Sequence, residues 1–239
     1  SWLSLLDPAY LKSRAALIGA QSLKVAQPGQ PGALKIGFAP MPEQPEYGTS
    51  HISIVDAHGN ALAMTTTIED AFGARQMVKG FLLNNELTDF SFAPTGADGQ
   101  PIANRVQPGK RPRSSMAPTL VFEKNADGSR GPLLMSGGSP GGALIIHYTA
   151  KTLHGVLNWG LTPQQAINLP NFGSTNGPSL LEEKKFPPAT VEALRTRGAE
   201  VREMNMTSGL QAITRANVHG KPMWLGGADP RREGVVLGD

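Results

Sequence analysis

The sequence contains no cysteine, which excludes disulfide bonds, a thiolate nucleophile and cysteine-based zinc sites. It has no run of about 18 apolar residues, so we expect no membrane-spanning segment in this chain. The five histidines lack a spacing typical of metal ligands, and we expect neither a metal ion nor another cofactor. No signal peptide opens the chain, but it begins with serine, so a targeting signal can precede it. The compartment stays open between periplasmic or secreted and cytoplasmic.

The chain also has only a small excess of positive charge. The net charge is +3 over 239 residues, and the densest basic patch, Lys110-Arg111-Pro112-Arg113, is short and has no aromatic residues between its charges. A nucleic-acid surface usually needs a broader basic stripe, so we expect no nucleic-acid partner. Apolar residues make up 39% of the chain, enough for a folded core, and 28 glycines with 20 prolines indicate many turns. The composition favours strands and loops with a few helices.

The pattern along the chain changes near residue 48. Apolar residues recur at helical spacing over residues 1–26, and Asp7-Pro8 is a suitable helix start, so we predict a helix there. Residues 27–47 are rich in proline and glycine and predict an extended linker or surface strap. Strand-like alternation begins at Thr49.

Three hairpins are expected in the rest of the chain. In each, two β-prone segments flank a turn-rich stretch, and the pairs are residues 51–56 with 61–67, 120–122 with 133–135, and 212–214 with 223–225. Helical spacing and capping residues predict helices over residues 143–157, 164–169 and 188–197. Hairpins separated by helices predict an α+β fold with a mostly antiparallel sheet packed by helices.

The junction Gly48-Thr49 can carry chemistry. If the peptide bond before Thr49 were cut, this residue would have both a hydroxyl and a free α-amine. The amine has a reference pKa of about 7.7–8, so it can act as base toward the hydroxyl of the same residue. The alternative is that Thr49 simply begins a strand, and spacing alone favours that alternative.

The glycine-rich run at residues 137–142 lies between an apolar strand and an apolar helix. It matches the G-x-S-x-G pattern of serine hydrolases around Ser139, but that pattern uses the backbone N–H of the next residue. Here that residue is Pro140, which has no N–H, so we reject Ser139 as a nucleophile. Gly141 and Gly142 at the start of the helix suit an oxyanion instead. A tight turn without a ligand is the alternative.

Two further groups of polar residues are candidates for ligand binding. Adjacent Ser114 and Ser115 lie in a proline-bounded loop and can donate hydrogen bonds to a carboxylate. Glu69, Glu86 and Asp89 follow apolar strand-like segments and can bind an ammonium group. Turn chemistry and a solvated acidic rim are the respective alternatives, and the residues alone leave both open.

The order of these motifs is more specific than any one of them. The segments in question are residues 49–56 (TSHISIVD), 59–61 (GNA), 65–67 (TTT), 72–73 (FG), 82–90 (LLNNELTDF), 110–116 (KRPRSSM), 138–142 (GSPGG) and 227–231 (GADPR). In this order and at similar spacing they resemble the small subunit of γ-glutamyltranspeptidases. Residues 49–239 would then be the catalytic domain, and residues 1–48 the tail of the large subunit with its junction.

The resemblance implies a four-layer αββα sandwich, the fold of N-terminal-nucleophile hydrolases. By resemblance, Thr49 is the nucleophile, freed by self-cleavage of the Gly48–Thr49 bond, and Thr67 orients it. Gly141 and Gly142 match the oxyanion hole. The implied reaction is a two-step acyl transfer through an ester on Thr49, with water or an amine as acceptor and glutathione as the usual donor.

The same resemblance assigns the substrate and the partner. Ser114 and Ser115 match the serines that hold the α-carboxylate of the γ-glutamyl group, and Glu86 and Asp89 match positions that hold its α-amine. The partner would be the large subunit of the same precursor, without which this chain is expected to be inactive.

One residue departs from the family pattern. Many transpeptidases carry asparagine where this chain has Glu69. The extra carboxylate either strengthens an ammonium site or suits another acyl group, so a cephalosporin or glutaryl-type acylase is an alternative. A catalytically inactive family member acting as a binding module is another.

Overall fold

The computed structural model describes residues 2–32, 37–39, 41 and 48–238, so most of the predicted linker lies outside the described residues. The chain begins with a 3-10 helix, η1 (Trp2–Leu6), and helix α1 (Pro8–Ala15), whose cap Asp7 accepts a hydrogen bond from the backbone N–H of Tyr10 at 2.8 Å. The predicted helix over residues 1–26 was therefore too long. Helix α1 buries none of its residues, and without a packing surface the helical spacing that follows does not extend it.

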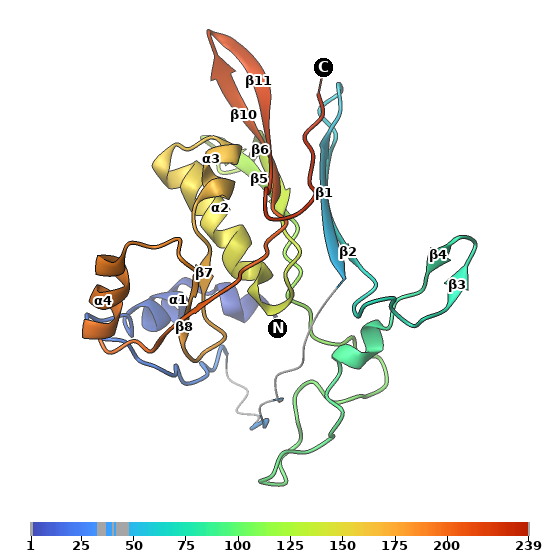
Figure 1. The fold of residues 1–239 in the computed structure, drawn as a ribbon, viewed down its shortest axis with the longest axis vertical. Coiled ribbons are helices and arrows are strands. Elements are labelled where there is room, and N and C mark those ends of the chain that lie inside the picture. Colours follow the sequence, from blue (N-terminus) through green and yellow to red (C-terminus); the bar gives the residue numbers. More distant parts are fainter. Residues whose placement is uncertain (1, 33–36, 40, 42–47, 239) are drawn as a thin grey trace.

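A four-stranded antiparallel sheet forms the centre of the molecule, in the order β11-β10-β6-β5 (Figure 1). Its strands are β5 (Thr119–Lys124), β6 (Arg130–Gly138), β10 (Gln211–Val218) and β11 (Lys221–Ala228). The second and third predicted hairpins are both confirmed, because β5 pairs with β6 and β10 pairs with β11.

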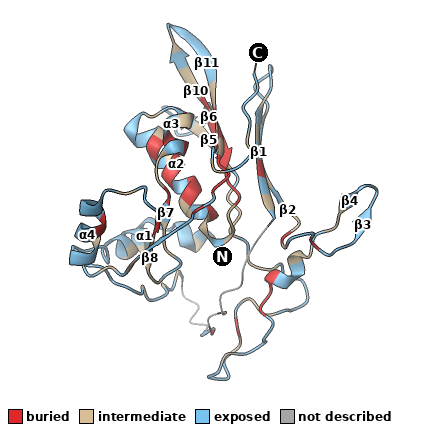
Figure 2. Cartoon of the chain, in the orientation of Figure 1, coloured by how far each residue is buried: buried red, intermediate tan, exposed pale blue. Residues whose placement is uncertain are grey.

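Helices cover one face of this sheet. Helix α2 (Ile145–Trp159) follows a short 3-10 turn, η3 (Gly142–Leu144), and helix α3 (Pro163–Asn168) starts at a capping box made by Thr162. The buried core lies between α2, α3 and the sheet, as the red segments of Figure 2 show. Its members are Met135, Tyr148, Ile167, Met206, Leu210 and Ala212.

The first predicted hairpin packs on the other face. Strands β1 (Thr49–Val55) and β2 (Ala61–Thr67) pair only with each other among the described residues and lie against β6 and β10 (Figure 1). The Ser136 hydroxyl of β6 donates to the carbonyl of Leu62 at 2.9 Å and links the two layers. The described residues thus form three layers, helix, sheet and hairpin, of an α+β fold.

Several small elements were not predicted from the sequence. Strand β7 (Phe172–Gly173) pairs with β8 (Ser179–Glu182), and β8 pairs in parallel with β9 (Val201–Met204) after the predicted helix α4 (Pro188–Thr196). Segments of two to four residues are too short to show a periodic pattern. The remaining short elements are β3 (Met77–Val78), β4 (Phe81–Leu82) and η2 (Glu86–Asp89). Among the described residues, none of the helices is long and apolar enough to cross a membrane.

Candidate active site

Two threonines meet at the open end of the β1–β2 hairpin. The pairing register puts Thr49, the first residue of β1, opposite Thr67, the last residue of β2. The Thr49 hydroxyl donates to the Thr67 hydroxyl oxygen at 3.1 Å, and the same oxygen accepts the backbone N–H of Glu69 at 2.8 Å. Because two donors point at the Thr67 oxygen, the hydroxyl of Thr49 is held in a defined direction.

The residue before Thr49 needs to be a glycine. Gly48 has a φ of +80°, which is the left-handed region, and a Cβ there would lie 3.0 Å from the carbonyl oxygen of Glu69. The backbone therefore turns sharply at Gly48, directly before the Gly48–Thr49 bond.

A small cavity borders this threonine pair. Seven of the residues predicted from the sequence line it, from four separate stretches of chain, together with Met116 and Ile145; the seven are Thr49, Thr67, Glu69, Glu86, Asp89, Ser114 and Ser115. The fold thus brings together a hydroxyl pair, three carboxylates and two further hydroxyls.

The carboxylates of this cavity are poorly solvated. Glu69 and Asp89 are only 6% and 7% exposed. Burial raises the pKa of Glu69, against the hydrogen bonds from Asn85 (Nδ2 to Oε2, 2.9 Å) and Thr88, and the charge of Asp89 raises it further. Burial also raises the pKa of Asp89, against the opposing charge of Arg113 and a side-chain hydrogen bond with Glu86. Such carboxylates gain from a cationic ligand, which is what an ammonium group would supply.

The two serines lie on the loop that leads into β5. Ser114 is exposed and Ser115 is half-buried. The Ser114 hydroxyl oxygen accepts the backbone N–H of Met116 at 3.3 Å, and Asn104 anchors the loop by accepting the backbone N–H of Arg113 at 2.9 Å. The loop thus holds both hydroxyls at the rim of the cavity.

The predicted oxyanion turn lies directly before the helices. Gly142 begins η3, and Ile145, the first residue of α2, lines the cavity beside Thr49. The two glycines themselves are not among the described residues that line it. Gly141 has a φ of +134°, and a Cβ there would lie 2.5 Å from the Tyr148 ring. Only glycine fits that position.

Ser139 is fully buried, which agrees with its rejection as a nucleophile. Its hydroxyl donates to the carbonyl of Pro140 at 2.7 Å, and its oxygen accepts the backbone N–H of Gly209 at 3.2 Å. A hydroxyl engaged in this way has no access to a substrate.

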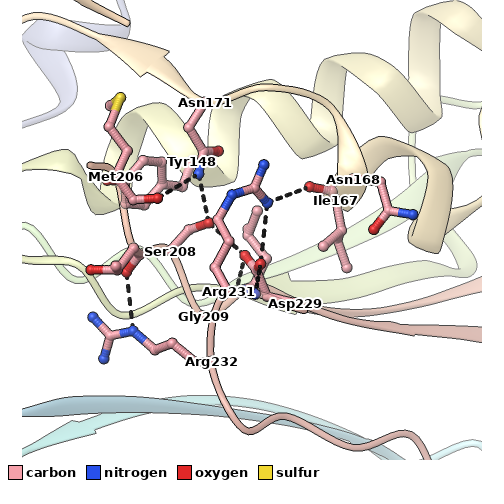
Figure 3. Close-up of polar contacts among 12 residues, drawn as sticks. Tyr148, Ile167, Asn168, Asn171, Met206, Ser208, Gly209, Asp229, Arg231 and Arg232 are labelled. Carbon is pink, nitrogen blue, oxygen red and sulfur yellow. Dashed lines mark hydrogen bonds and ion pairs between the residues drawn. The ribbon is translucent and has the colours of Figure 1, made fainter. Parts of the chain in front are cut away.

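The sequence interpretation missed a buried polar cluster behind this turn (Figure 3). Asp229 accepts hydrogen bonds from Ser208 and from Arg231, and the Arg231 guanidinium forms a bidentate pair with Glu182 at 2.8 Å for both contacts. Arg232 donates to the carbonyl of Thr207 at 3.0 Å. The only sequence signal was the GADPR segment (residues 227–231), which is part of the family pattern but was assigned no role.

His51 was also not assigned a role. Its imidazole is buried and lies within hydrogen-bond distance of the Thr65 hydroxyl (2.8 Å) and the Ser53 hydroxyl (3.1 Å). Burial lowers the pKa of His51 to about 4, so the ring is neutral near pH 7 and supports the hairpin from inside. Within the part of the chain that the structure describes, no group of histidine and acidic side chains could hold a metal ion.

A hairpin stacked on a helix-covered antiparallel sheet, with a threonine at its open end, defines this chain as part of an N-terminal-nucleophile hydrolase fold. The γ-glutamyltranspeptidase family model matches residues 1–239, and the chain belongs to that family.

Relatives and solved structures agree with this membership. The chain is 34% identical to the glutathione hydrolase proenzyme of Bacillus subtilis (strain 168), over 98% of this chain and 39% of the relative. It is also 34% identical to the glutathione hydrolase proenzyme of Escherichia coli (strain K12), over 89% of this chain and 36% of the relative. The chain thus spans about two fifths of the length of these relatives.

Two solved structures illustrate the likeness. A mutant of Helicobacter pylori γ-glutamyltranspeptidase superposes with a TM-score of 0.66 and 29% identity, over 76% of this chain and 99% of that chain. Cephalosporin acylase from Bacillus halodurans gives a TM-score of 0.74 and 25% identity, over 97% of this chain and 38% of that chain.

Proposed function

We propose that this chain carries the catalytic part of an enzyme that hydrolyses or transfers γ-glutamyl groups through an acyl ester on Thr49. The observation that carries the proposal is the Thr49–Thr67 hydroxyl pair at the edge of a cavity with three carboxylates and two serines. Relatives named glutathione hydrolase proenzymes support it.

Thr49 becomes competent when the Gly48–Thr49 bond is cut by the protein itself. The cut frees an α-amine whose reference pKa of about 7.7–8 suits a general base near neutral pH. The word proenzyme in the names of the relatives supports such processing. The Helicobacter pylori structure supports it too, because 76% of this chain covers 99% of that solved chain. Residues 49–239, the part after the proposed cut, make up a similar share of this sequence, about four fifths.

The first half of the reaction forms the ester. The α-amine of Thr49 takes the hydroxyl proton, Oγ1 attacks the γ-amide carbonyl, and backbone N–H groups of Gly141 and Gly142 stabilise the oxyanion. Thr67 orients the attacking hydroxyl. As the tetrahedral intermediate collapses, the C–N bond breaks and the leaving amine takes a proton from the α-ammonium of Thr49. The glutamyl group remains as an ester on Thr49.

The second half reverses these roles. Water or the amine of an amino acid or peptide gives its proton to the Thr49 amine and attacks the ester carbonyl. The oxyanion again forms at the glycine turn, and Oγ1 leaves with a proton. The product is free glutamate or a new γ-glutamyl amide.

The donor is recognised at its α-carbon. Ser114 and Ser115 donate hydrogen bonds to the α-carboxylate, and the α-ammonium lies among Glu69, Glu86 and Asp89. The ammonium offsets the desolvation that raises the pKa values of Glu69 and Asp89.

An acylase for a dicarboxylic acyl group is the second candidate, because the Bacillus halodurans cephalosporin acylase superposes well on this chain. A glutaryl group has no ammonium to pair with the three carboxylates, which favours the γ-glutamyl donor. Rates with glutathione and with the matching glutaryl amide decide between them, and a faster glutaryl amide would make this chain an acylase.

The partner we propose is the larger remainder of the same precursor. The outer face of the hairpin exposes a stripe of four apolar side chains in two cross-strand pairs, Ile52 with Met64 and Ile54 with Leu62. An exposed apolar sheet face suits a second protein layer. The chain alone is therefore expected to be inactive.

The experiment that tests the proposal uses the full-length protein. The masses of its denatured subunits are measured for wild type and for Thr49→Ala, alongside release of glutamate from glutathione. A cut before Thr49 that disappears in the variant, together with loss of activity, supports the proposal. A folded wild type that stays uncut and inactive would instead establish a binding module that lacks catalysis.

A further inference from the structure

We infer that Ser139 is a positioning residue that, anchored by the buried Asp229 cluster, aims the backbone N–H of Gly141 at the reacting carbonyl. The inference rests on the proposed function, in which that N–H stabilises the oxyanion. It gives the serine of the G-x-S-x-G pattern a role although it is not the nucleophile.

The first step of the argument is the geometry of one peptide plane. The Ser139 hydroxyl donates to the carbonyl of Pro140 at 2.7 Å. The carbonyl of Pro140 and the N–H of Gly141 belong to the same planar peptide unit and point in opposite directions when the unit is trans. No peptide bond among the described residues is cis. Fixing the carbonyl toward buried Ser139 therefore fixes the Gly141 N–H away from it.

The second step is what holds Ser139 itself. Its oxygen accepts the backbone N–H of Gly209 at 3.2 Å. Both neighbours of Gly209 are tied to one carboxylate oxygen of Asp229, because the Ser208 hydroxyl donates to it at 2.5 Å and the Leu210 N–H at 3.1 Å. In Figure 3, Ser208, Gly209 and Asp229 lie side by side. The donor to Ser139 is thus fixed on both sides.

The third step is the rigidity of the carboxylate. Asp229 is 1% exposed and also accepts hydrogen bonds from the Arg231 guanidinium and backbone N–H, at 3.1 and 3.0 Å. The same guanidinium is locked by Glu182, and Asn171 donates to the Ser208 hydroxyl at 2.7 Å. A buried network of this kind holds its members in one arrangement, because moving any of them breaks several hydrogen bonds.

The Tyr148 ring also lies close to Gly141, because a Cβ built on that residue would be 2.5 Å from it. The turn is therefore restrained by an aromatic ring as well as by a hydrogen-bonded serine. Donors of an oxyanion site act by being oriented before the reaction, so a small rotation of this peptide lowers the rate more than it lowers substrate affinity.

The test compares two buried serines in the full-length protein. Ser139→Ala removes the hydroxyl that holds the turn. Ser136→Ala removes an equally buried hydroxyl from the same stretch, one that donates to the carbonyl of Leu62 instead. Turnover of L-γ-glutamyl-4-nitroanilide is measured per cleaved subunit, together with thermal stability.

For Ser139→Ala we expect kcat to fall by about tenfold or more while KM changes less than about twofold, since an interaction made only in the transition state is weakened. For Ser136→Ala we expect a similar loss of thermal stability with kcat within about twofold of wild type. Ser208→Ala, one step further from the turn, is expected to lower kcat by about threefold and covers the case in which Ser139→Ala does not fold.

Folded Ser139→Ala or Ser208→Ala protein with wild-type kcat would overturn the positioning role and leave the proposed function intact. Equal kcat losses in Ser139→Ala and Ser136→Ala would also overturn it, because the effect would then be general. A wild type that neither cuts itself nor turns over the amide would overturn the proposed function, and the positioning role with it.

Discussion

The molecule buries two groups of carboxylates, and they are treated in opposite ways. Glu182 and Asp229 both pair with the guanidinium of Arg231, and the buried Lys151 ammonium lies close enough to interact with both charges. Glu69 and Asp89 lie close enough for the charge of Asp89 to raise the pKa of Glu69. Glu69 is hydrogen-bonded by the neutral side chains of Asn85 and Thr88, whereas Asp89 shares a hydrogen bond with Glu86 and feels the charge of Arg113. The first group is complete without a ligand, whereas the second gains from a cation. Burial of charge is therefore structural in the first group, and under the proposed function it serves ligand binding in the second.

The largest expected effect breaks the compensated group. Arg231→Ala leaves the buried carboxylates of Glu182 and Asp229 without the guanidinium that pairs with both, so the free energy of unfolding is expected to fall by about 3–5 kcal/mol. Urea unfolding followed by circular dichroism measures this. Arg215→Ala, which removes the partially exposed pair with Glu123, is the control and is expected to change stability by less than about 1 kcal/mol. Similar losses in both variants would contradict the comparison.

The next effect concerns the carboxylates of the cavity. Glu69→Gln keeps the size of the side chain and removes its charge, so stability is expected to stay level or rise. KM for a γ-glutamyl donor is expected to increase about 10- to 100-fold, the range for losing a hydrogen bond between charged groups. The exposed Glu192→Gln is the matched control. An unchanged KM would show that Glu69 does not face the ammonium.

The two groups also predict opposite dependences on pH. The raised pKa of Glu69 means that its contribution to stability is fully present below its unfolded pKa and is lost as pH rises through the folded value. Although burial alone would raise the pKa of Glu182, hydrogen bonds from Arg231 and Asn171 hold it below its usual range. Its contribution is therefore present above the unfolded pKa and is lost as pH falls through the folded one.

Thermal unfolding between pH 3 and 7 separates these slopes. In wild type, Glu69 lowers stability as pH rises, and Glu69→Gln is expected to remove this decrease. Glu182 lowers stability as pH falls, and Glu182→Gln is expected to remove that decrease. Donor affinity is expected to weaken as acid protonates Glu69 and Asp89. A wild-type affinity that does not change over this range would contradict the ammonium site.

The smallest expected effect concerns Lys151, which lies beside the group of Arg231, Glu182 and Asp229. Lys151 is buried and donates to the carbonyls of Ile167 and Leu169, and burial lowers its pKa to about 8. Arg231 donates to the same two carbonyls. Lys151→Met therefore leaves both acceptors satisfied and is expected to change the unfolding free energy by about 1 kcal/mol or less. A loss as large as that of Arg231→Ala would mean that the lysine charge is an essential part of the group.

Local patterns carried most of what the sequence could predict. The hairpins follow from alternation and turn residues. The pairing of Thr49 with Thr67 was implied only by the resemblance, and in the structure it results from the register of one hairpin. Gly141 and Gly142 could be located because a strand ends and a helix begins around them. Their chemical roles remain predictions that the experiments above test.

Other features depend on distant parts of the chain. The bond from Gly209 to Ser139 spans 70 positions, and no local pattern announces it. The parallel pairing of β8 with β9 requires a helix to cross between two very short strands. The helix over residues 1–26 was predicted too long because its apolar residues have helical spacing along the chain. In the structure α1 buries none of its residues, so no packing surface extends the helix.

The hairpin has one more consequence, for the order in which this protein is made. Strands β1 and β2 pair only with each other among the described residues, so the outer edge of each offers unpaired backbone groups beside the apolar stripe. Such edges recruit any strand that reaches them, including those of other copies. In the proposed precursor both parts of the fold belong to one polypeptide, which gives the intended neighbour an effective concentration in the millimolar range, far above that of a competing molecule. The proposed cut before Thr49, if it follows folding, would keep the hairpin out of aggregates, whereas two chains made separately would first have to find each other.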